Sequence, residues 1–224
     1  MAPEALWRPE SLDELRDRAD RAGAEALDTA ECLALAIRAG AGPRAELWAG
    51  RLLARFGSLP EVLGADRPAL EREATPQVAR AVMVIHDLHR RALRAPLAAR
   101  PVLAGLAAVS DYLRVVLAAE RREQVRALFL DKRLRLIADE VLGRGTVDHA
   151  PVYPREVLRR ALELGASGLV LAHNHPGGSA RASPGDLDMT RQVAAAGAAL
   201  RIALHDHLLV AGDEVVSFRA AGWL

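Results

Sequence analysis

Cysteine and long apolar runs are the scarcest features of this sequence. Cys32 is the one cysteine among 224 residues, so no internal disulfide can form. Its Ala- and Leu-rich helical surroundings favour a buried structural thiol over a nucleophile. No apolar run approaches the roughly 18 residues of a membrane span, and the N-terminus is acidic and polar where a signal peptide has a basic start and an apolar centre. We therefore expect a cytoplasmic protein that does not enter a membrane.

An excess of charge of one sign is also missing. The sequence has 30 Lys+Arg against 29 Asp+Glu, and no block of like charge forms a tail. The composition therefore indicates no polyanionic partner. Hydrophobic residues, by contrast, make up 51% of the 224 residues, which is enough to bury the core of one large or two small domains.

A short apolar segment in the second half of the chain ends in two histidines, His173 and His175. The segment 168–172 is too short for a helix and is bounded by turn residues, so it predicts a buried strand. Residues two apart on a strand point to the same side, and both imidazoles can therefore reach one point in space. The Pro-Gly-Gly-Ser stretch 176–179 then predicts a turn.

The pattern of a helix start follows this turn. Ser183 stands at the N-cap, Pro184 at the first helical position and Asp186 at the third. The Asp186 carboxylate is thereby directed back toward the two histidines. Each residue alone has an ordinary interpretation, as a hydrogen-bonded polar group or a helix cap. Joined on one strand-turn-helix they favour an open Zn²⁺ site, one per chain, that keeps water in its last position.

The spacing His173-x-His175, seven residues, Ser183, two residues and Asp186 resembles the JAMM signature of MPN-domain zinc metalloproteases. The run HNHPGG and its flanks are similar to the RadC family in particular. The similarity is dense over residues 102–224 and looser before them. Further similar segments are REQVRALFLD at 122–131, LIADEVLGRGTVD at 136–148, APVYPREVLRRALELGA at 150–166 and HDHLLVAG at 205–212.

Two domains are expected. Residues 11–93 are helical throughout, with breaks at Gly and Pro, and resemble the helix-hairpin-helix region of RadC proteins. Pro96 and Pro101 interrupt the helical pattern in residues 93–103 and predict a linker there. We therefore expect a helical domain at 1–99 and an MPN domain at 102–224.

The second domain alternates helices and strands. The order read from the pattern is α-β-β-β-α-β-α-β-β, a mixed sheet flanked by helices, which is the α/β (α+β) class and also what the resemblance to the MPN (JAMM, cytidine-deaminase-like) fold implies. Its expected elements are helices at about 103–121, 154–165 and 184–199, and strands at 125–130, 134–141, 168–172, 202–210 and 215–218.

DNA is a weakly supported partner. RadC relatives carry a Gly-x-Gly turn in the second hairpin, where this chain has the acidic stretch 71–76, and the Gly-x-Gly at 40–42 is more often an ordinary turn. Residues 1–100 hold 15 Arg and 15 Asp+Glu, so this region has no net positive field to attract a duplex.

The resemblance implies hydrolysis of an amide or (iso)peptide bond, with a protein or peptide as substrate. An acid outside the ligand set takes a proton from the attacking water, and Ser183, by family analogy, donates a hydrogen bond to the developing oxyanion. Simple N-capping is the alternative for Ser183. Glu123 and Glu140 are the two candidates for this general base. Glu123 immediately precedes a hydrophobic strand, as the catalytic Glu of the family does, although it could also be a solvent-facing charge.

A second His-x-His, at residues 205–207, lacks a downstream Ser-x-x-Asp. We expect Asp206 and His207 to lie behind the ligands, with Asp206 as partner for the second nitrogen of a ligand imidazole. A structural pair is the alternative.

Two other classes of function stay open. The first is a metal-free DNA-repair scaffold that binds nucleic acid through residues 1–94. The second is a metal-dependent nuclease or amidohydrolase with two metals. The sequence indicates neither the particular substrate nor the oligomeric state.

Overall fold

The computed structural model describes residues 12–99, 101–102, 106–118, 120–145 and 152–224. The chain divides into two compact units, residues 1–87 and 88–224, and each has its own hydrophobic core. Residues 11, 100 and 103, where the sequence predicts helical and linker boundaries, lie outside the described part. Among the described residues, no helix has both the length and the apolar character needed to cross a membrane.

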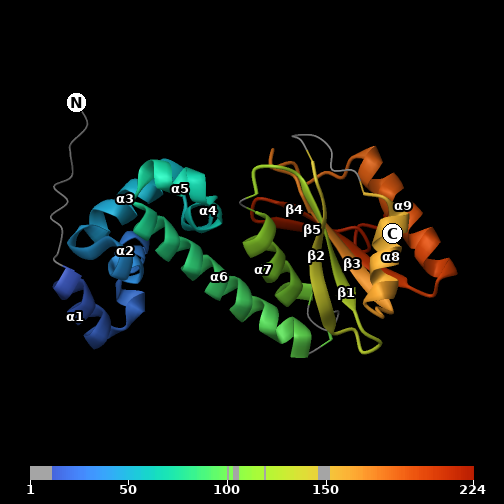
Figure 1. The fold of residues 1–224 in the computed structure, drawn as a ribbon, viewed down its shortest axis with the longest axis horizontal. Coiled ribbons are helices and arrows are strands. Elements are labelled where there is room, and N and C mark those ends of the chain that lie inside the picture. Colours follow the sequence, from blue (N-terminus) through green and yellow to red (C-terminus); the bar gives the residue numbers. More distant parts are fainter. Residues whose placement is uncertain (1–11, 100, 103–105, 119, 146–151) are drawn as a thin grey trace. The chain divides into compact units, whose positions relative to one another are not determined.

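The first unit is built of helices (Figure 1). Asp28 and Glu31 form a reciprocal capping box at the start of the second helix. Gly40 lets this helix approach the sixth closely, because a Cβ there would lie 2.6 Å from the carbonyl oxygen of Gln77. Its helices are α1 (Leu12–Ala22), α2 (Thr29–Ala41), α3 (Ala45–Phe56), α4 (Leu59–Gly64), α5 (Arg67–Glu73) and the start of α6 (Pro76–Ala99), with 3₁₀ turns at Ala24–Ala26 and Gly42–Arg44.

The expectation that Pro96 ends the helical pattern is wrong, because α6 continues through it to Ala99. Proline removes one backbone donor, and the carbonyl that would have accepted it belongs to Ala92, four residues earlier. Both residues are exposed, so water can satisfy that carbonyl. On the other side of the helix Leu97 is buried and Leu93 half-buried against the core of the second unit. That packing outweighs the lost hydrogen bond.

The second unit is a five-stranded mixed sheet in the order β2-β1-β3-β4-β5. β3 and β4 are parallel, and the other neighbours are antiparallel. The expected fold class is confirmed, but the described residues hold two strands before the helix α8, not the three of the expected order. The elements are α7 (Leu106–Leu117), β1 (Gln124–Leu130), β2 (Leu136–Arg144), α8 (Pro154–Glu163), β3 (Gly168–Asn174), α9 (Pro184–Ala199), β4 (Ala203–Ala211) and β5 (Glu214–Ser217).

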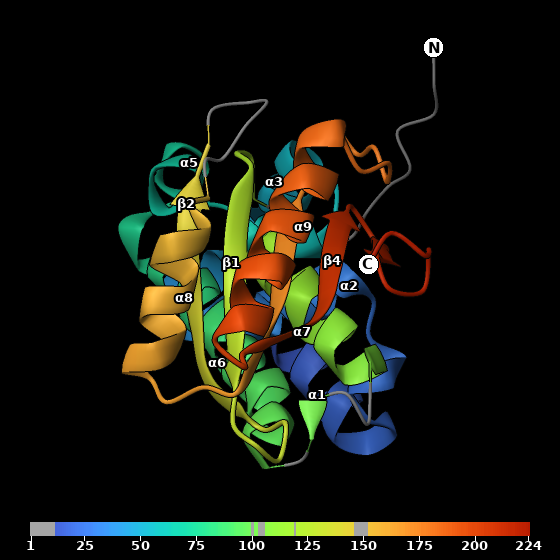
Figure 2. The ribbon, with the colours of Figure 1, turned by 90° about the vertical axis from the view of Figure 1, so that its right-hand side faces the viewer.

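Each face of this sheet buries a separate core because alternate side chains point to opposite faces. Leu128, Val170 and Leu208 pack with α7 on one face. Phe129 and Leu171 pack with α8 and α9 on the other. Figure 2 shows α8 and α9 side by side over this second face.

A buried ion pair lies on the α7 face. Arg126 of β1 donates from Nε and Nη2 to the two oxygens of Asp139 on β2, at 2.9 and 2.8 Å. The Tyr112 hydroxyl of α7 also donates to Asp139. Burial, followed by the charge and hydrogen bond of Asp139, raises the pKa of Tyr112 to about 12. This cluster fastens α7 to the first two strands.

Candidate metal centre

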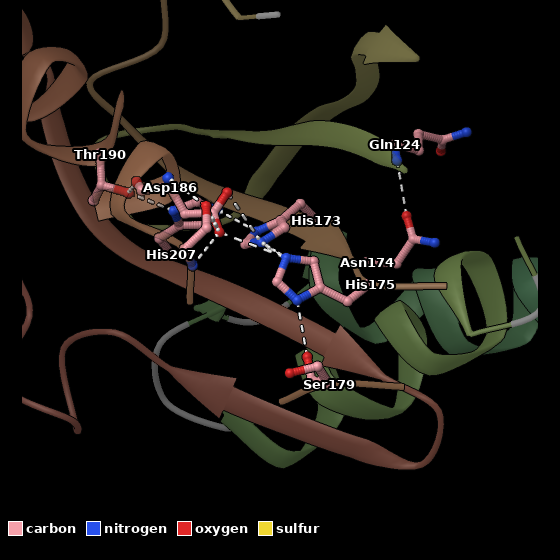
Figure 3. Close-up of polar contacts among 9 residues, drawn as sticks. Gln124, His173, Asn174, His175, Ser179, Asp186, Thr190 and His207 are labelled. Atoms are coloured by element: carbon pink, nitrogen blue, oxygen red, sulfur yellow. Dashed lines mark hydrogen bonds and ion pairs between the residues drawn. The ribbon is translucent and has the colours of Figure 1, made fainter. Parts of the chain in front are cut away.

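The two histidines of the strand end lie together at the carboxyl end of β3 (Figure 3). His173 lies opposite Val125 of β1 in the antiparallel register, so its side chain is on the face that α9 covers. His173 is fully buried, and His175 leaves 18% of its side chain exposed. The expected strand was two residues shorter. Pairing of β3 with its neighbours β1 and β4 extends it, so His173 and Asn174 belong to the sheet.

Asp186 is brought to the histidines by the start of α9. Ser183 is the N-cap, and its backbone N–H and Oγ–H both donate to Asp186 Oδ2 at 2.7 Å. The Asp186 N–H donates in return to Ser183 Oγ at 3.1 Å, which completes the expected capping box. These bonds fix the carboxylate and leave Oδ1 turned toward His173.

The three side chains converge on one point. The Nε2 atoms of His173 and His175 are 3.2 Å apart, and each lies 3.5 Å from an oxygen of Asp186. All the potential ligand atoms lie within 4.8 Å of one another. Burial raises the pKa of Asp186, but the His173 ring in its protonated form, by hydrogen bond and charge, and the two Ser183 donors outweigh burial, so the pKa lies below its ordinary value. Such a group could hold a metal ion.

His175 presents a lone pair to this point. Its Nδ1 lies 2.8 Å from the carbonyl oxygen of Ser179 in the following turn. A carbonyl only accepts, so Nδ1 carries the proton and Nε2 is free to coordinate. The turn after β3 therefore orients the His175 ring, as the other nitrogen of a metal-bound histidine is usually oriented.

His173 is held from behind by a third imidazole. Its Nδ1 lies 2.8 Å from Nε2 of His207 on β4, and Nδ1 of His207 lies 2.6 Å from Thr190 Oγ1 on α9. Burial first, then the neighbouring His173, lower the pKa of His207 well below its ordinary value. The Phe218 ring covers His207 with centroids 4.3 Å apart. Thr190 was missed in the sequence, although it follows Asp186 by four residues and so shares its helix face.

Asp206 is not the partner of a ligand imidazole, which corrects that expectation. Alternation puts its side chain on the face opposite His207, because neighbouring residues of a strand point to opposite sides. There Asp206 Oδ1 accepts from the N–H groups of His207 and Arg219, at 2.7 and 3.0 Å, and Oδ2 accepts from Ser217 Oγ at 2.5 Å. Asp206 therefore fastens the C-terminal turn to β4.

Glu123 is buried beside the first residue of β1. Its carbonyl accepts from the Gly145 N–H at 2.8 Å. The side chain of Asn174 binds both neighbours: Oδ1 accepts from the Gln124 N–H at 2.8 Å, and Nδ2 donates to the Arg122 carbonyl at 3.2 Å. Nδ2 also donates to the carbonyl of Glu120 at 3.0 Å. The middle residue of His-Asn-His thus fixes the backbone on both sides of Glu123, a role that the sequence did not indicate.

Glu140 is engaged elsewhere. Its two oxygens accept from Nη2 and Nε of Arg160 on α8, at 2.6 and 2.8 Å. The Arg160 hydrogen bonds outweigh partial burial and lower the pKa of Glu140. In the sheet register Glu140 lies opposite Ala127, two residues along β1 from the partner of His173.

Comparison with known proteins agrees with this architecture. The family model described as the RadC-like JAB domain matches residues 103–223, so the mixed sheet that carries the His173, His175 and Asp186 group is a domain of the JAB (MPN) class. A UPF0758 protein of Rhodobacter capsulatus is 45% identical over 215 residues, covering 94% of this chain and 100% of that protein. The chain belongs to the RadC (UPF0758) family.

Proposed function

We propose that this protein is a zinc-dependent hydrolase of amide or (iso)peptide bonds. The observation that carries the proposal is the convergence of two imidazole nitrogens and one carboxylate at the end of β3 in a JAB domain. Within the described parts of the chain this is the one group of His, Cys, Asp or Glu side chains assembled in this way. Two nitrogens and one oxygen suit zinc, and three protein ligands match its catalytic sites.

Zinc held there would act as a Lewis acid and lower the pKa of a bound water toward neutrality. The protein itself then has to supply a proton acceptor. Glu123 is two residues before Val125, the cross-strand partner of His173. If the alternation of β1 continues to it, its carboxylate lies on the face of the sheet that carries the ligands. Glu140 is a poorer acceptor because Arg160 stabilises its charged form.

Ser183 has one hydroxyl proton, and that proton is directed at Asp186 Oδ2. Its first role in the proposed mechanism is therefore to hold the Asp186 carboxylate in place. Donation to a substrate oxyanion, which the family resemblance implies, requires the hydroxyl to turn away from Asp186 when substrate binds. The backbone N–H of Ser183 would keep Asp186 in position during that change.

A nucleic-acid role is not favoured by the first unit. Glu73 lies in the acidic stretch that replaces a Gly-x-Gly turn. It accepts hydrogen bonds from Arg51 and Arg55 of α3, at 3.4 and 3.2 Å. Two arginines that could otherwise contact phosphate are thus paired with a carboxylate.

Metal analysis of the purified protein tests the proposal. We expect about one zinc per chain, lost in His173→Ala and in His175→Ala because each removes one of three ligands. His205→Ala, in the other His-x-His, is the matched control and should keep its zinc. The zinc-loaded protein should cleave members of a panel of fluorogenic peptides and isopeptide-linked conjugates, and a chelator should abolish the cleavage. Wild-type protein that cannot be loaded with zinc would refute the site.

A further inference from the structure

A relay of hydrogen bonds runs behind the metal-binding group and returns to it. It starts at the backbone carbonyl of Asp186, passes through Thr190 Oγ1 and His207, and ends at Nδ1 of His173. The three distances are 2.5 Å from Thr190 to Asp186, 2.6 Å from Thr190 to His207 and 2.8 Å from His207 to His173. All three side chains of the relay, Thr190, His207 and His173, are fully buried, so water does not compete for these bonds.

The protons in this relay can be placed by elimination. The Asp186 carbonyl can only accept, so the single hydroxyl proton of Thr190 belongs to that contact. Thr190 Oγ1 must then accept from His207, whose Nδ1 carries a proton. A neutral imidazole has one N–H, so Nε2 of His207 is an acceptor and takes its bond from the Nδ1–H of His173. Nε2 of His173 is left with its lone pair, facing Asp186 and His175.

We infer that Thr190 and His207 are positioning residues that select the one neutral tautomer of His173 able to bind a metal through Nε2. The inference rests on the metal site of the proposed function and deepens it. The inference also assigns His207 the role of hydrogen-bond acceptor for His173. Its Nε2 is committed to His173, so His207 is not a fourth ligand, although it is the third histidine at the centre.

The opposite proton arrangement shows why Thr190 matters. Were Thr190 to donate to His207, two oxygens without a proton between them would face each other at 2.5 Å. His207 would then donate from Nε2 to His173, and the remaining proton of His173 would sit on Nε2, where the metal must bind. The bond from Thr190 to the carbonyl one helical turn earlier excludes this state. Asp186 thus acts on His173 from two sides. Its carboxylate lies beside Nε2, and its carbonyl, through Thr190 and His207, fixes the proton on Nδ1.

Zinc affinity, measured by competition with a chromogenic chelator, is the first test. Thr190→Val keeps the shape of the side chain but removes the acceptor for His207, and we expect zinc to bind about 10- to 100-fold more weakly, as for other outer partners of metal-bound histidines. Thr190→Ser keeps the hydroxyl and should restore affinity. Ser217→Ala is the matched control, because it removes a hydroxyl bonded to Asp206 on the opposite face of β4, and its affinity should equal wild type.

The second test reads the tautomers directly and needs no metal. Nitrogen-15 NMR of the metal-free wild type, at a pH where the rings are neutral, should show Nδ1–H on both His173 and His207. Nε2–H on His207 would overturn the inference, as would unchanged zinc affinity in folded Thr190→Val. If wild type shows the expected tautomers but takes up no zinc, the proposed function fails while the relay stands. This measurement stays decisive even if Thr190→Val does not fold.

Discussion

Asp186 contributes three kinds of atom to the centre. Its carboxylate faces the two histidines, its N–H closes the cap of α9 with Ser183, and its carbonyl receives the Thr190 hydroxyl. A substitution at this position alters the carboxylate, and with it the proposed ligand set and the cap, while the main-chain N–H and carbonyl remain. Asp186→Asn, which keeps the shape and the cap acceptor but removes the charge, is the mildest way to separate the ligand role from the other two.

Glu123→Gln should leave the fold and zinc content intact and abolish hydrolysis. An amide cannot take the proton that a carboxylate takes, and loss of proton transfer lowers rates by a factor on the order of 10² to 10⁴. The rate on whichever peptide substrate the panel identifies is the measurement.

Glu140→Gln is the matched control for this change, since Glu140 lies on the neighbouring strand and is paired with Arg160. It should cost some stability and leave the rate near wild type. An inactive Glu140→Gln beside an active Glu123→Gln would reverse the assignment.

The raised pKa of Tyr112 predicts that the folded protein loses stability at alkaline pH. Its pKa is raised to about 12 in the folded protein, against about 10 for an exposed phenol. Between these values the unfolded chain releases a proton that the folded chain retains. The stabilisation of the folded state by the Tyr112 hydroxyl is therefore complete below pH 10 and disappears as the pH rises through 12. The loss amounts to something on the order of 2 kcal/mol.

Urea unfolding at several pH values measures this loss. Tyr112→Phe should be less stable than wild type at neutral pH, and the difference should shrink between pH 10 and 12. Tyr153 is the other tyrosine of the chain and is exposed, so Tyr153→Phe should keep the wild-type pH dependence. A constant gap between wild type and Tyr112→Phe would contradict the assignment.

The candidate metal ligands could be predicted from the sequence because their geometry is local. His173 and His175 share a face through strand alternation, and Asp186 is oriented by its own cap. His207 and Asn174 act across elements far apart in the chain, and so does Thr190 in its contact with His207, so no short pattern reveals these partners. Asp206 was misassigned for the same reason: alternation gives its face, but only the fold shows that this face is away from the centre.

Among the elements, β3 holds the residues 120–124 that lead into and begin β1. Asn174 provides two hydrogen bonds to the loop before β1, at 3.0 and 3.2 Å, and one to the first residue of β1, at 2.8 Å, and is itself buried. The general base of the proposed mechanism lies in this loop. The strand that carries the ligands thus also sets the position of Glu123.

Asn174→Ala should loosen this loop and leave the metal site intact. Three backbone groups lose their partner, of which the Gln124 N–H is buried and the Glu120 and Arg122 carbonyls are part-buried, at a cost of about 1 to 3 kcal/mol for a group that water cannot reach. We expect faster amide hydrogen exchange at Glu123 and Gln124, a reduced rate of hydrolysis and unchanged zinc affinity. Asn174→Asp keeps the acceptor for Gln124 and should protect that amide more than Asn174→Ala does. Exchange rates equal to wild type in both variants would show that this segment keeps its structure without the Asn174 hydrogen bonds.

The strands and helices of the second unit were largely predictable because their periods are clear, and α9 begins and ends at the residues expected. The end of α6 was not predictable. Proline signals a break through local geometry, whereas Leu93 and Leu97 extend the helix through contacts with residues far along the chain.

For the whole molecule, the division between the units falls inside α6, after Asp87. A chain that begins at Leu88 should therefore fold and bind zinc, while one that begins at Arg100 should be weakened by roughly 3 kcal/mol, since it lacks Leu97 and Leu93. Urea unfolding and zinc titration of the two fragments measure the difference. In the full chain, Leu97→Ala should reproduce much of the loss and Leu88→Ala, at an exposed position, very little. Equal stability of the two fragments would place the boundary after α6.

His173, Asn174 and His175 are consecutive, and they serve opposite faces of one strand. An inserted or deleted residue within β3 would turn every following side chain to the other face. One such event would remove both imidazoles from Asp186 and also release the loop that holds Glu123, so no partly working intermediate would remain. The turn at 176–182 is constrained too, because it forms the seven-residue spacing between His175 and Ser183 and its Ser179 carbonyl holds the His175 ring. Among members of the family, gaps in an alignment should therefore spare both the strand and this turn.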